Sequence, residues 1–204
     1  MSEDTNITGQ PEKPNVLKSL AEFLGQQNMK VFVPKIQRAY AQGRKSEENI
    51  RNQFCDELFN ALENGNCLEL SFVYGSKIAV NNGESIRFEL LDGQQRVTTL
   101  VLLYWFLSCA SGVSIPEWLK SFTYETRTTS TNFLHELSKS SLDVVSRKPS
   151  DTIRNIQWYT LAFDKDSSVE GMLNMLDAFY DRFNQSECKE KLYANLDNIR
   201  FYEL

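Results

Sequence analysis

Two alternating runs of apolar and polar residues, followed at once by a long apolar stretch, place the strongest constraint on how this 204-residue chain folds. In the first run residues 68, 70, 72 and 74 share one face, and in the second run residues 86, 88 and 90 do. Asn82-Gly83 between the runs is a strong signal for a β-hairpin turn. The second run stops at Asp92-Gly93, and residues 97–107 follow helical spacing with apolar side chains on most of the circumference. These patterns predict a strand, a tight turn and a buried helix at the centre of the fold.

The segment before this centre contains patterns for a helix, a strand, a loop and a second helix. Asn15 is expected to cap a helix over residues 16–24. Residues 31–33 are β-branched or aromatic and precede a proline, which predicts a short strand followed by a loop over residues 35–40. A second helix is predicted from a cap at Ser46 to Gly65, with an apolar residue at every fourth position.

The segment after residue 116 is predicted to be mainly helical. Ser130 is a candidate cap for a short helix around Phe133, and Ser167 with Glu170 forms a capping box before a longer amphipathic helix. Residues 199–204 alternate like a strand. Because a chain that ends in a strand is expected to leave an unpaired edge, we expect these 204 residues to be truncated from a longer protein. The predicted organisation is a flexible tail over residues 1–14, a core over 15–115 and a mainly helical extension over 116–204.

Charge and composition exclude several classes of function. The 22 lysines and arginines are outnumbered by 27 aspartates and glutamates, and the net charge of -5 does not suit a protein that coats nucleic acid, although a local basic site stays possible. No stretch reaches the roughly 18 uninterrupted apolar residues of a membrane helix. The first fourteen residues lack the features of a secretory signal, so we expect a cytoplasmic protein without a membrane partner.

The cysteines and the single histidine limit the chemistry available to the chain. The four cysteines match neither a zinc-ligand spacing nor a dense disulfide framework, and we expect reduced, mostly buried thiols. One histidine, His135, excludes a multi-histidine metal site. Chemistry in this chain therefore depends on carboxylates, arginines, amides and hydroxyls.

The sequence D-G-Q-Q-R at residues 92–96 lies where the predicted strand meets the predicted buried helix. The free N–H groups and the dipole of a helix start favour an anion, so this turn is a candidate phosphate site. Gly93 lets the backbone approach a ligand, Arg96 can bind phosphate oxygens, and Asp92 can hold a divalent cation or orient a water. In the alternative interpretation Asp92 only caps the helix and Arg96 pairs with a surface carboxylate. The G-x-x-x-x-G-K-[ST] pattern of P-loop NTPases is absent.

The loop after the predicted strand 31–33 supplies a second candidate set. Lys35, Arg38, Arg44 and Lys45 form a small basic cluster that suits nucleic-acid phosphates, and Tyr40 could stack on a base. A solvated charged loop, with Tyr40 lying flat on the protein, is the alternative. The polar segment 124–130 is best interpreted as a turn.

Three motifs together resemble the N-terminal domain of GmrSD-type modification-dependent restriction enzymes. They are V-P-x-I-Q-R-A-Y at residues 33–40, D-G-Q-Q-R with T-T-L at residues 92–100, and Y-x-T-R with S and F-L at residues 124–134. The resemblance runs from about Val31 to the end of the chain. It implies an α/β (α+β) fold with a small ParB/sulfiredoxin-like mixed sheet and packed helices. It also implies nucleotide binding, and hydrolysis in some members, coupled to defence against phage DNA with modified bases.

Carried onto this sequence, the resemblance assigns roles to individual residues. The catalytic set would be Asp92, Gln94, Gln95 and Arg96, with Asp92 also as the Mg²⁺ ligand. The nucleotide-binding set would be Gln37, Arg38, Tyr40, Gly93, Arg96, Thr98 and Thr99, with Arg127 as a weaker candidate. The implied cofactors are a nucleoside triphosphate and Mg²⁺, and the implied partners are DNA and a nuclease domain that follows in a longer chain.

Two classes of function follow from these motifs. The domain is either a nucleotide-dependent switch or NTPase, or a DNA-binding sensor without turnover that uses Lys35, Arg38, Arg44 and Lys45 on phosphates. A degenerate scaffold is a third alternative. Because no nuclease motif is visible, we expect no DNA cleavage by these residues alone.

Overall fold

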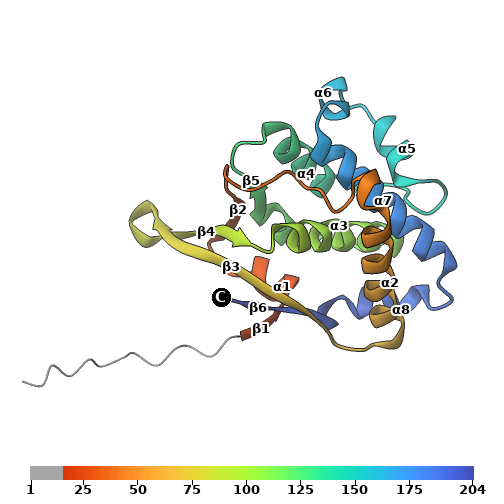
Figure 1. Ribbon diagram of the computed structural model, residues 1–204, viewed down its shortest axis with the longest axis horizontal. Coiled ribbons are helices and arrows are strands. Elements are labelled where there is room, and N and C mark those ends of the chain that lie inside the picture. Colours follow the sequence, from red (N-terminus) through yellow and green to blue (C-terminus); the bar gives the residue numbers. More distant parts are fainter. Residues whose placement is uncertain (1–15) are drawn as a thin grey trace, which may run out of the picture.

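The computed structural model describes residues 16–204 and contains one mixed six-stranded sheet with helices packed against it (Figure 1). The predicted tail over residues 1–14 and the predicted cap at Asn15 lie outside the described residues. The strands follow the order β1-β6-β3-β4-β2-β5 across the sheet. Their bounds are β1 Val16–Ser19, β2 Met29–Val33, β3 Leu68–Val80, β4 Ser85–Asp92, β5 Phe122–Tyr124 and β6 Ile199–Glu203.

Eight α-helices and four short 3₁₀ helices connect the strands of residues 16–204. The α-helices are α1 Leu20–Leu24, α2 Glu48–Asn64, α3 Gln94–Ala110, α4 Thr128–Lys139, α5 Pro149–Arg154, α6 Leu161–Asp164, α7 Ser167–Gln185 and α8 Lys189–Ala194. The 3₁₀ helices are η1 Lys45–Glu47, η2 Asn81–Gly83, η3 Glu117–Ser121 and η4 Leu196–Asn198. None of these helices is long and apolar enough to span a bilayer. The α+β class predicted from the sequence is confirmed, whereas the specific likeness to ParB and sulfiredoxin stays a prediction.

The predicted centre of the fold is present. Strands β3 and β4 form an antiparallel hairpin that turns through Asn81, Asn82 and Gly83, all with positive φ, and projects from the body of the molecule (Figure 1). Helix α3 follows β4 directly, and every residue from Val97 to Ser108 is buried. An entirely buried helix needs apolar side chains around its whole circumference, which this stretch supplies.

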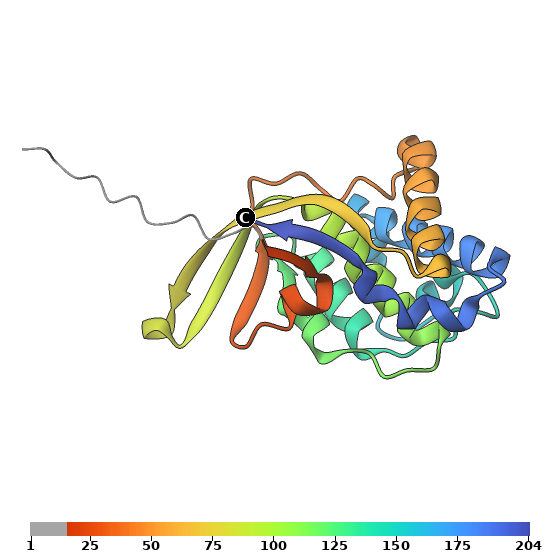
Figure 2. The ribbon, with the colours of Figure 1, turned by 90° about the horizontal axis from the view of Figure 1, so that it is seen from below.

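One face of the sheet carries the hydrophobic core. Alternate residues of β2 and β4, among them Val31 and Phe88, face inward and are buried with α1 and α3 in a single cluster. The ring of Phe23 in α1 packs edge-on against Phe88 of β4 and against Phe201 of β6. Helix α1, drawn in red-orange in Figure 2, lies beside the sheet and joins two separate strands on this face. The opposite face of the sheet keeps several half-exposed side chains.

A β-bulge corrects the simple alternation predicted for residues 68–74. Leu70 is buried, but the register between β3 and β6 shifts between Leu70 and Phe72, and Val73 rather than Phe72 or Tyr74 then faces the core. The extra residue of a bulge reverses which side chains point inward. Phe72 and Tyr74 consequently lie on the exposed face, 48% and 49% accessible.

Four predicted helix starts differ from the observed ones. Residues 16–19 form β1, and Ser19 caps α1 through a capping box with Glu22, so the first helix begins later than expected. Asp166, not Ser167, caps α7 by accepting a hydrogen bond from the N–H of Ser168. Ser130 lies inside α4, where its hydroxyl donates to Asp166. Ser46 lies inside η1, and α2 begins after Glu47 without a side-chain cap.

Strand β6 is paired on both sides, antiparallel to β1 and parallel to β3. The prediction of an unpaired edge at residues 199–204 is therefore wrong. Truncation from a longer protein stays a prediction, but it can no longer be argued from an unpaired edge. The division of the chain at residues 115 and 116 also stays a prediction. The sheet itself spans that division, because β5 and β6 come from the later segment.

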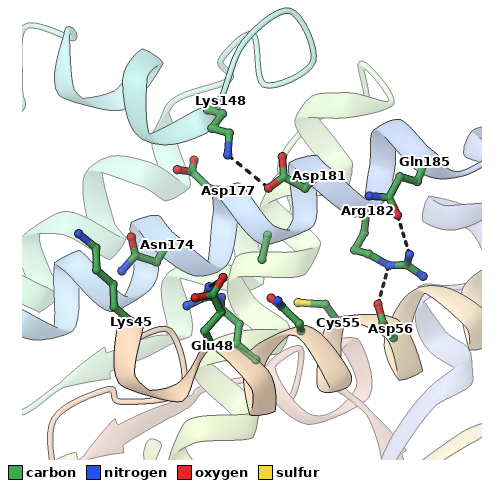
Figure 3. Close-up of a pocket in the computed structure, with 13 residues that line it drawn as sticks. Lys45, Glu48, Cys55, Asp56, Lys148, Asn174, Asp177, Asp181, Arg182 and Gln185 are labelled. Atoms are coloured by element: carbon green, nitrogen blue, oxygen red, sulfur yellow. Dashed lines mark hydrogen bonds and ion pairs between the residues drawn. The ribbon is translucent and has the colours of Figure 1, made fainter.

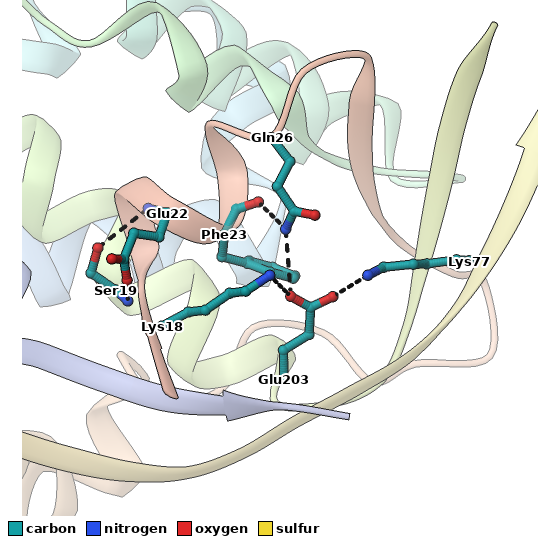
Figure 4. A network of polar contacts seen from close by, with 7 residues as sticks. All are labelled: Lys18, Ser19, Glu22, Phe23, Gln26, Lys77 and Glu203. Carbon is teal, nitrogen blue, oxygen red and sulfur yellow. Dashed lines mark hydrogen bonds and ion pairs between the residues drawn. The ribbon is translucent and has the colours of Figure 1, made fainter. Parts of the chain in front are cut away.

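The carboxylate of Glu203 ties the two ends of the described chain together (Figure 4). It accepts from Lys18 of β1 and Lys77 of β3, both at 2.5 Å, and its side chain is only 8% exposed. Burial raises the pKa of this carboxyl, but the hydrogen bonds from both lysines outweigh it, so the pKa lies below the ordinary value. The ionised carboxylate of Glu203 therefore stabilises the fold at pH values above the ordinary carboxyl pKa. This stabilisation is lost as the pH falls through the lowered pKa of the folded state.

Candidate nucleotide site at the start of α3

The three sequence motifs meet at one edge of the sheet. Strand β2 pairs in parallel with β4 on one side and with β5 on the other, so the carboxyl ends of these three strands lie side by side. The loop 34–44 follows β2, Gly93 follows β4, and the turn 125–127 follows β5. Ligands of α/β sheets bind outside the carboxyl ends of parallel strands. The motifs separated in sequence thus form one candidate site.

Gly93 is the residue that fits helix α3 to the sheet. It is the N-cap of α3 with φ of 89°, and a Cβ built on it would lie 3.0 Å and 3.1 Å from atoms of Val73 and 3.3 Å from the carbonyl oxygen of Phe72. Positive φ and this close approach both favour glycine. No side chain among the described residues caps the helix, so Asp92 is not the cap that the alternative interpretation required. The first N–H groups of α3 are left for solvent or a ligand.

The two glutamines of the motif hold the loop 34–44 against α3. Gln95 accepts from the backbone N–H groups of Ala41 at 2.8 Å and Gln42 at 3.2 Å, and it donates to the carbonyl of Ala39 at 3.1 Å. Gln94, 4% exposed, donates to the carbonyl of Arg38 at 2.6 Å. Both were predicted as catalytic residues, but their side chains bind the protein's own backbone and position the loop.

The far end of the same loop is fixed by α2. Arg51 of α2 is buried, and its Nη1 donates to the carbonyls of Gly43 and Arg44, both at 3.2 Å. The loop is therefore attached at several points along its length, and the exposed side chains between these points project from an ordered backbone.

Tyr40, Thr98 and Thr99 are corrections to the predicted nucleotide-binding set. All three are fully buried, because they pack between the loop and α3 instead of facing solvent. Thr99 Oγ1 lies 2.9 Å from two acceptors, the Gln42 Oε1 and the Gln95 carbonyl oxygen. Because the single hydroxyl proton of Thr99 is directed at these acceptors, the Tyr40 hydroxyl, 2.7 Å away, donates to Thr99. Burial raises the pKa of Tyr40 well above its ordinary value, and the contact with Thr99 offsets only part of this. A ring in this position cannot stack on a base.

The charged residues of the motif are on the surface. Asp92 is 72% exposed at its side chain, and Arg96 Nη2 lies 3.3 Å from its Oδ2. Arg38 and Lys35 are exposed and make no ion pair with residues 16–204. The side-chain amide of Gln37 donates to the carbonyl of Leu91 at 2.8 Å, and the backbone carbonyl of Gln37 accepts from Arg127 at 3.4 Å. These contacts bring Gln37 and Arg127 to the edge where the three strands end.

A small cavity lies beside this edge, between the loop and the start of α2. Its volume is about 320 Å³, and its lining includes Arg38, Gln95 and Glu47. Close by, the Oε1 of Gln94 is buried without a hydrogen-bond partner among the described residues. A buried acceptor without a partner costs stability unless a donor reaches it.

The basic residues predicted to bind DNA do not form one surface. Lys35 and Arg38 lie at the strand ends, whereas Lys45 lines a separate groove of about 670 Å³ between α2 and α7 (Figure 3). In that groove Lys148 pairs with Asp181 and Arg182 with Asp56. The cationic and anionic residues of its lining are equal in number: Lys45, Arg51, Lys148 and Arg182 against Glu48, Asp56, Asp177 and Asp181. The groove is therefore polar but not basic.

The fit of Mg²⁺ to this site rests on Asp92. No cluster of three or more His, Cys, Asp or Glu side chains suited to a metal occurs in residues 16–204. One exposed carboxylate is nonetheless compatible with Mg²⁺, which is usually held by one or two carboxylates together with substrate phosphates. The residues fit a metal that arrives with a nucleotide rather than one held by the protein alone.

Sequence reasoning missed the residues that support the site from other elements. Ser168 of α7 accepts from the N–H of Tyr40 at 3.1 Å. Gln42 also contacts Thr99. No local pattern marks these positions, because their partners lie far away in sequence.

A family model matches nearly the whole of the described chain. The model described as "GmrSD restriction endonuclease, N-terminal domain" matches residues 20–204, which include every described element except β1. No curated protein matches the chain at a significant level.

Proposed function

The chain belongs to the family of GmrSD restriction endonuclease N-terminal domains, and from this premise we propose that it binds a nucleoside triphosphate at the start of α3. The observation that carries the proposal is the uncapped start of this 17-residue helix, which has Arg96 in its first turn and lies at the edge where the segments with Arg38 and Arg127 leave the neighbouring strands. A helix N-terminus attracts phosphate through its free N–H groups and its dipole.

Arg96 is the proposed phosphate ligand of the site. Its side chain is 23% exposed, and the ion pair that it makes with Asp92 joins it to a mostly exposed carboxylate. Exposed ion pairs contribute little to stability, so a phosphate can replace this contact at small cost. The N–H groups of the first turn of α3, which no side chain of the described residues caps, would supply further contacts to the phosphate.

Asp92 has a different proposed role. Together with the nucleotide phosphates it would hold Mg²⁺, which when bound neutralises phosphate charge and so assists phosphoryl transfer. Its second oxygen is left to orient an attacking water. Gln94 and Gln95 act as positioning residues that keep Gln37 and Arg38 facing the site.

The membership in a restriction endonuclease family extends the proposal to the whole protein. We infer that the full-length enzyme acts in restriction of phage DNA, with DNA as its partner and a nuclease domain elsewhere in the chain. Residues 1–204 alone are expected not to cut plasmid DNA with Mg²⁺ or Mn²⁺.

A DNA sensor without turnover is the second candidate, favoured by the exposed Lys35 and Arg38. Binding through phosphate contacts should weaken steeply as salt rises and should not respond to nucleotide. The separation of Lys45 from Lys35 and the balanced charge of the α2/α7 groove favour the nucleotide site instead.

Calorimetric titration with each nucleoside triphosphate, with and without Mg²⁺, tests the proposal. We expect saturable binding of at least one of them. The absence of binding for all four, at millimolar nucleotide, would contradict it.

The role of Asp92 is tested by Asp92→Asn on the same preparation. The variant should bind nucleotide at least as tightly without Mg²⁺, because a carboxylate beside a polyphosphate repels it. Any phosphate release by the wild type should fall by about a hundredfold or more. Equal phosphate release in both proteins would remove Asp92 from the mechanism.

A further inference from the structure

The face of the sheet that no helix of the core covers carries two aromatic side chains next to the proposed nucleotide site. Phe72 and Tyr74 of β3 are 48% and 49% exposed, while Val73 between them is fully buried. Phe72 also contacts Tyr202 of β6, with ring centroids 5.9 Å apart. Large exposed rings that share a sheet face mark a surface that meets another molecule.

The register of the sheet places these rings beside the catalytic candidate. Tyr74 lies directly opposite Asp92 in the β3–β4 ladder. The register shifts between Tyr74 and Gly75, so this pair lies at an irregularity of the ladder, and both side chains are exposed there, 49% for Tyr74 and 72% for Asp92. Gly93, the next residue, packs onto the backbone of Phe72 and Val73. The rings and the phosphate-binding turn are therefore continuous.

Other exposed apolar side chains extend the same patch. Leu91 is 39% exposed, and Ile36 on the loop after β2 is 83% exposed. The side chain of Gln37 binds the carbonyl of Leu91, which brings this loop to the end of β4. The proposed site thus has a charged side, formed by Asp92, Arg96 and Arg38, and an apolar side.

We infer that the nucleobase of the bound nucleoside triphosphate stacks on Tyr74, and that the ring of Phe72 extends the aromatic platform that the two side chains form. The inference rests on the proposed function, since the phosphates must lie at Gly93 and Arg96 for the base to reach the rings. An aromatic ring binds any base through its face, so the platform tolerates all four bases. The continuity of the rings with Asp92 selects a free nucleotide over a nucleic-acid strand or a second protein as the occupant.

The test compares nucleotides with inorganic tripolyphosphate, which has the phosphates but no base. Tyr74→Ala should weaken binding of ATP and GTP by about tenfold, within the range measured for base stacking, and leave binding of tripolyphosphate unchanged. Tyr74→Phe should retain nucleotide affinity, because the ring is kept. Ile78→Ala is the matched control, since Ile78 is 41% exposed on the same strand but beyond the site.

A second variant gives a direct signal. Tyr74→Trp should show quenching of its added fluorescence by ATP but not by tripolyphosphate, whereas Ile78→Trp should show neither.

The outcomes separate this inference from the proposed function. If Tyr74→Ala leaves nucleotide affinity unchanged, or weakens tripolyphosphate equally, the stacking inference is wrong while the phosphate site stands. If the wild type binds neither nucleotide nor tripolyphosphate, both are wrong. If Tyr74→Ala weakens a single-stranded oligonucleotide but not ATP, the occupant is nucleic acid and the inference is overturned.

Discussion

The glutamines of the D-G-Q-Q-R motif and its two charged residues have opposite surroundings. Gln94 and Gln95 are turned toward the loop 34–44 and bind its backbone, whereas Asp92 is mostly exposed, Arg96 is partly exposed, and within residues 16–204 the ion pair of each is with the other. Five consecutive residues thus contain a structural half and a half that is left for a ligand. The comparison teaches that a motif can be specific in sequence although only some of its members contact the ligand.

Replacing Gln95 with leucine should produce the largest effect on stability. Two backbone N–H groups and one carbonyl of the loop would lose their partner, and each unsatisfied buried group costs about 1–3 kcal/mol. Allowing for partial solvation, we expect a loss of about 2–4 kcal/mol in the free energy of unfolding, measured by urea denaturation. Gln53→Leu is the control, since Gln53 is exposed and contacts only Glu57. A loss equal to that of the control would contradict the structural role of Gln95.

Arg96→Ala should show the reverse behaviour. A charge-assisted contact contributes about 1.5–3 kcal/mol, so nucleotide affinity should fall by about tenfold to a hundredfold in calorimetry. The melting temperature without ligand should hardly change, because the pair with Asp92 is exposed. Arg154→Ala removes a comparable surface pair with Asp164 and should leave affinity unchanged. An unfolded Arg96→Ala variant would show that Arg96 supports the fold, as the two glutamines do, and would contradict its role as a ligand-binding residue.

Tyr40→Phe is a milder test of how the loop 34–44 is held against α3. The variant loses only the hydroxyl that donates to Thr99, and we expect a loss of about 1 kcal/mol in the free energy of unfolding. Because burial raises the pKa of Tyr40 in the fold, the wild type should lose stability as the pH rises above about 10, where the unfolded tyrosine ionises. Tyr40→Phe should flatten part of this alkaline decline, although the pKa of the buried Tyr124 is raised too. Identical alkaline profiles would show that Tyr40 ionises freely.

The smallest expected change in stability belongs to Asp92→Asn. The side chain is exposed, makes no cap and has one weak ion pair, so the free energy of unfolding should stay within about 0.5 kcal/mol of wild type. A thermal melt without ligand measures this. A larger loss would show that Asp92 helps to hold the start of α3. Asp92 would then support the fold as well as being available to a ligand.

The centre of the fold was predictable because its signals are local. Asn82-Gly83 indicates its own turn, and the apolar run after Arg96 indicates a buried helix without reference to other segments. The convergence of the three motifs was not derivable from periodicity or turn signals, since it depends on β2 pairing with both β4 and β5. Those pairings join segments far apart in sequence.

The burial of Tyr40 was hidden for a similar reason. A tyrosine on a polar loop has no local pattern that distinguishes an exposed ring from a buried one, and its partners Thr99 and Ser168 come from α3 and α7. The bulge after Leu70 has only one weak signal in the sequence, the apolar Val73 at a position where the alternation expects a polar residue. The platform of Phe72 and Tyr74 could therefore not be found before the register was known.

The pairing of β1 with β6 has a consequence for how this protein is made on the ribosome. Lys18 and Glu203 are separated by 185 positions, so β1 emerges long before the strand that pairs with it. At about 5–20 residues per second, β1 waits roughly ten to forty seconds for its partner. The β4-β2-β5 part of the sheet, complete by Tyr124, can assemble during synthesis, whereas β3 keeps one open edge until β6 is released. The nascent chain therefore carries two unpaired strand edges, a hazard for aggregation, until β6 leaves the exit tunnel.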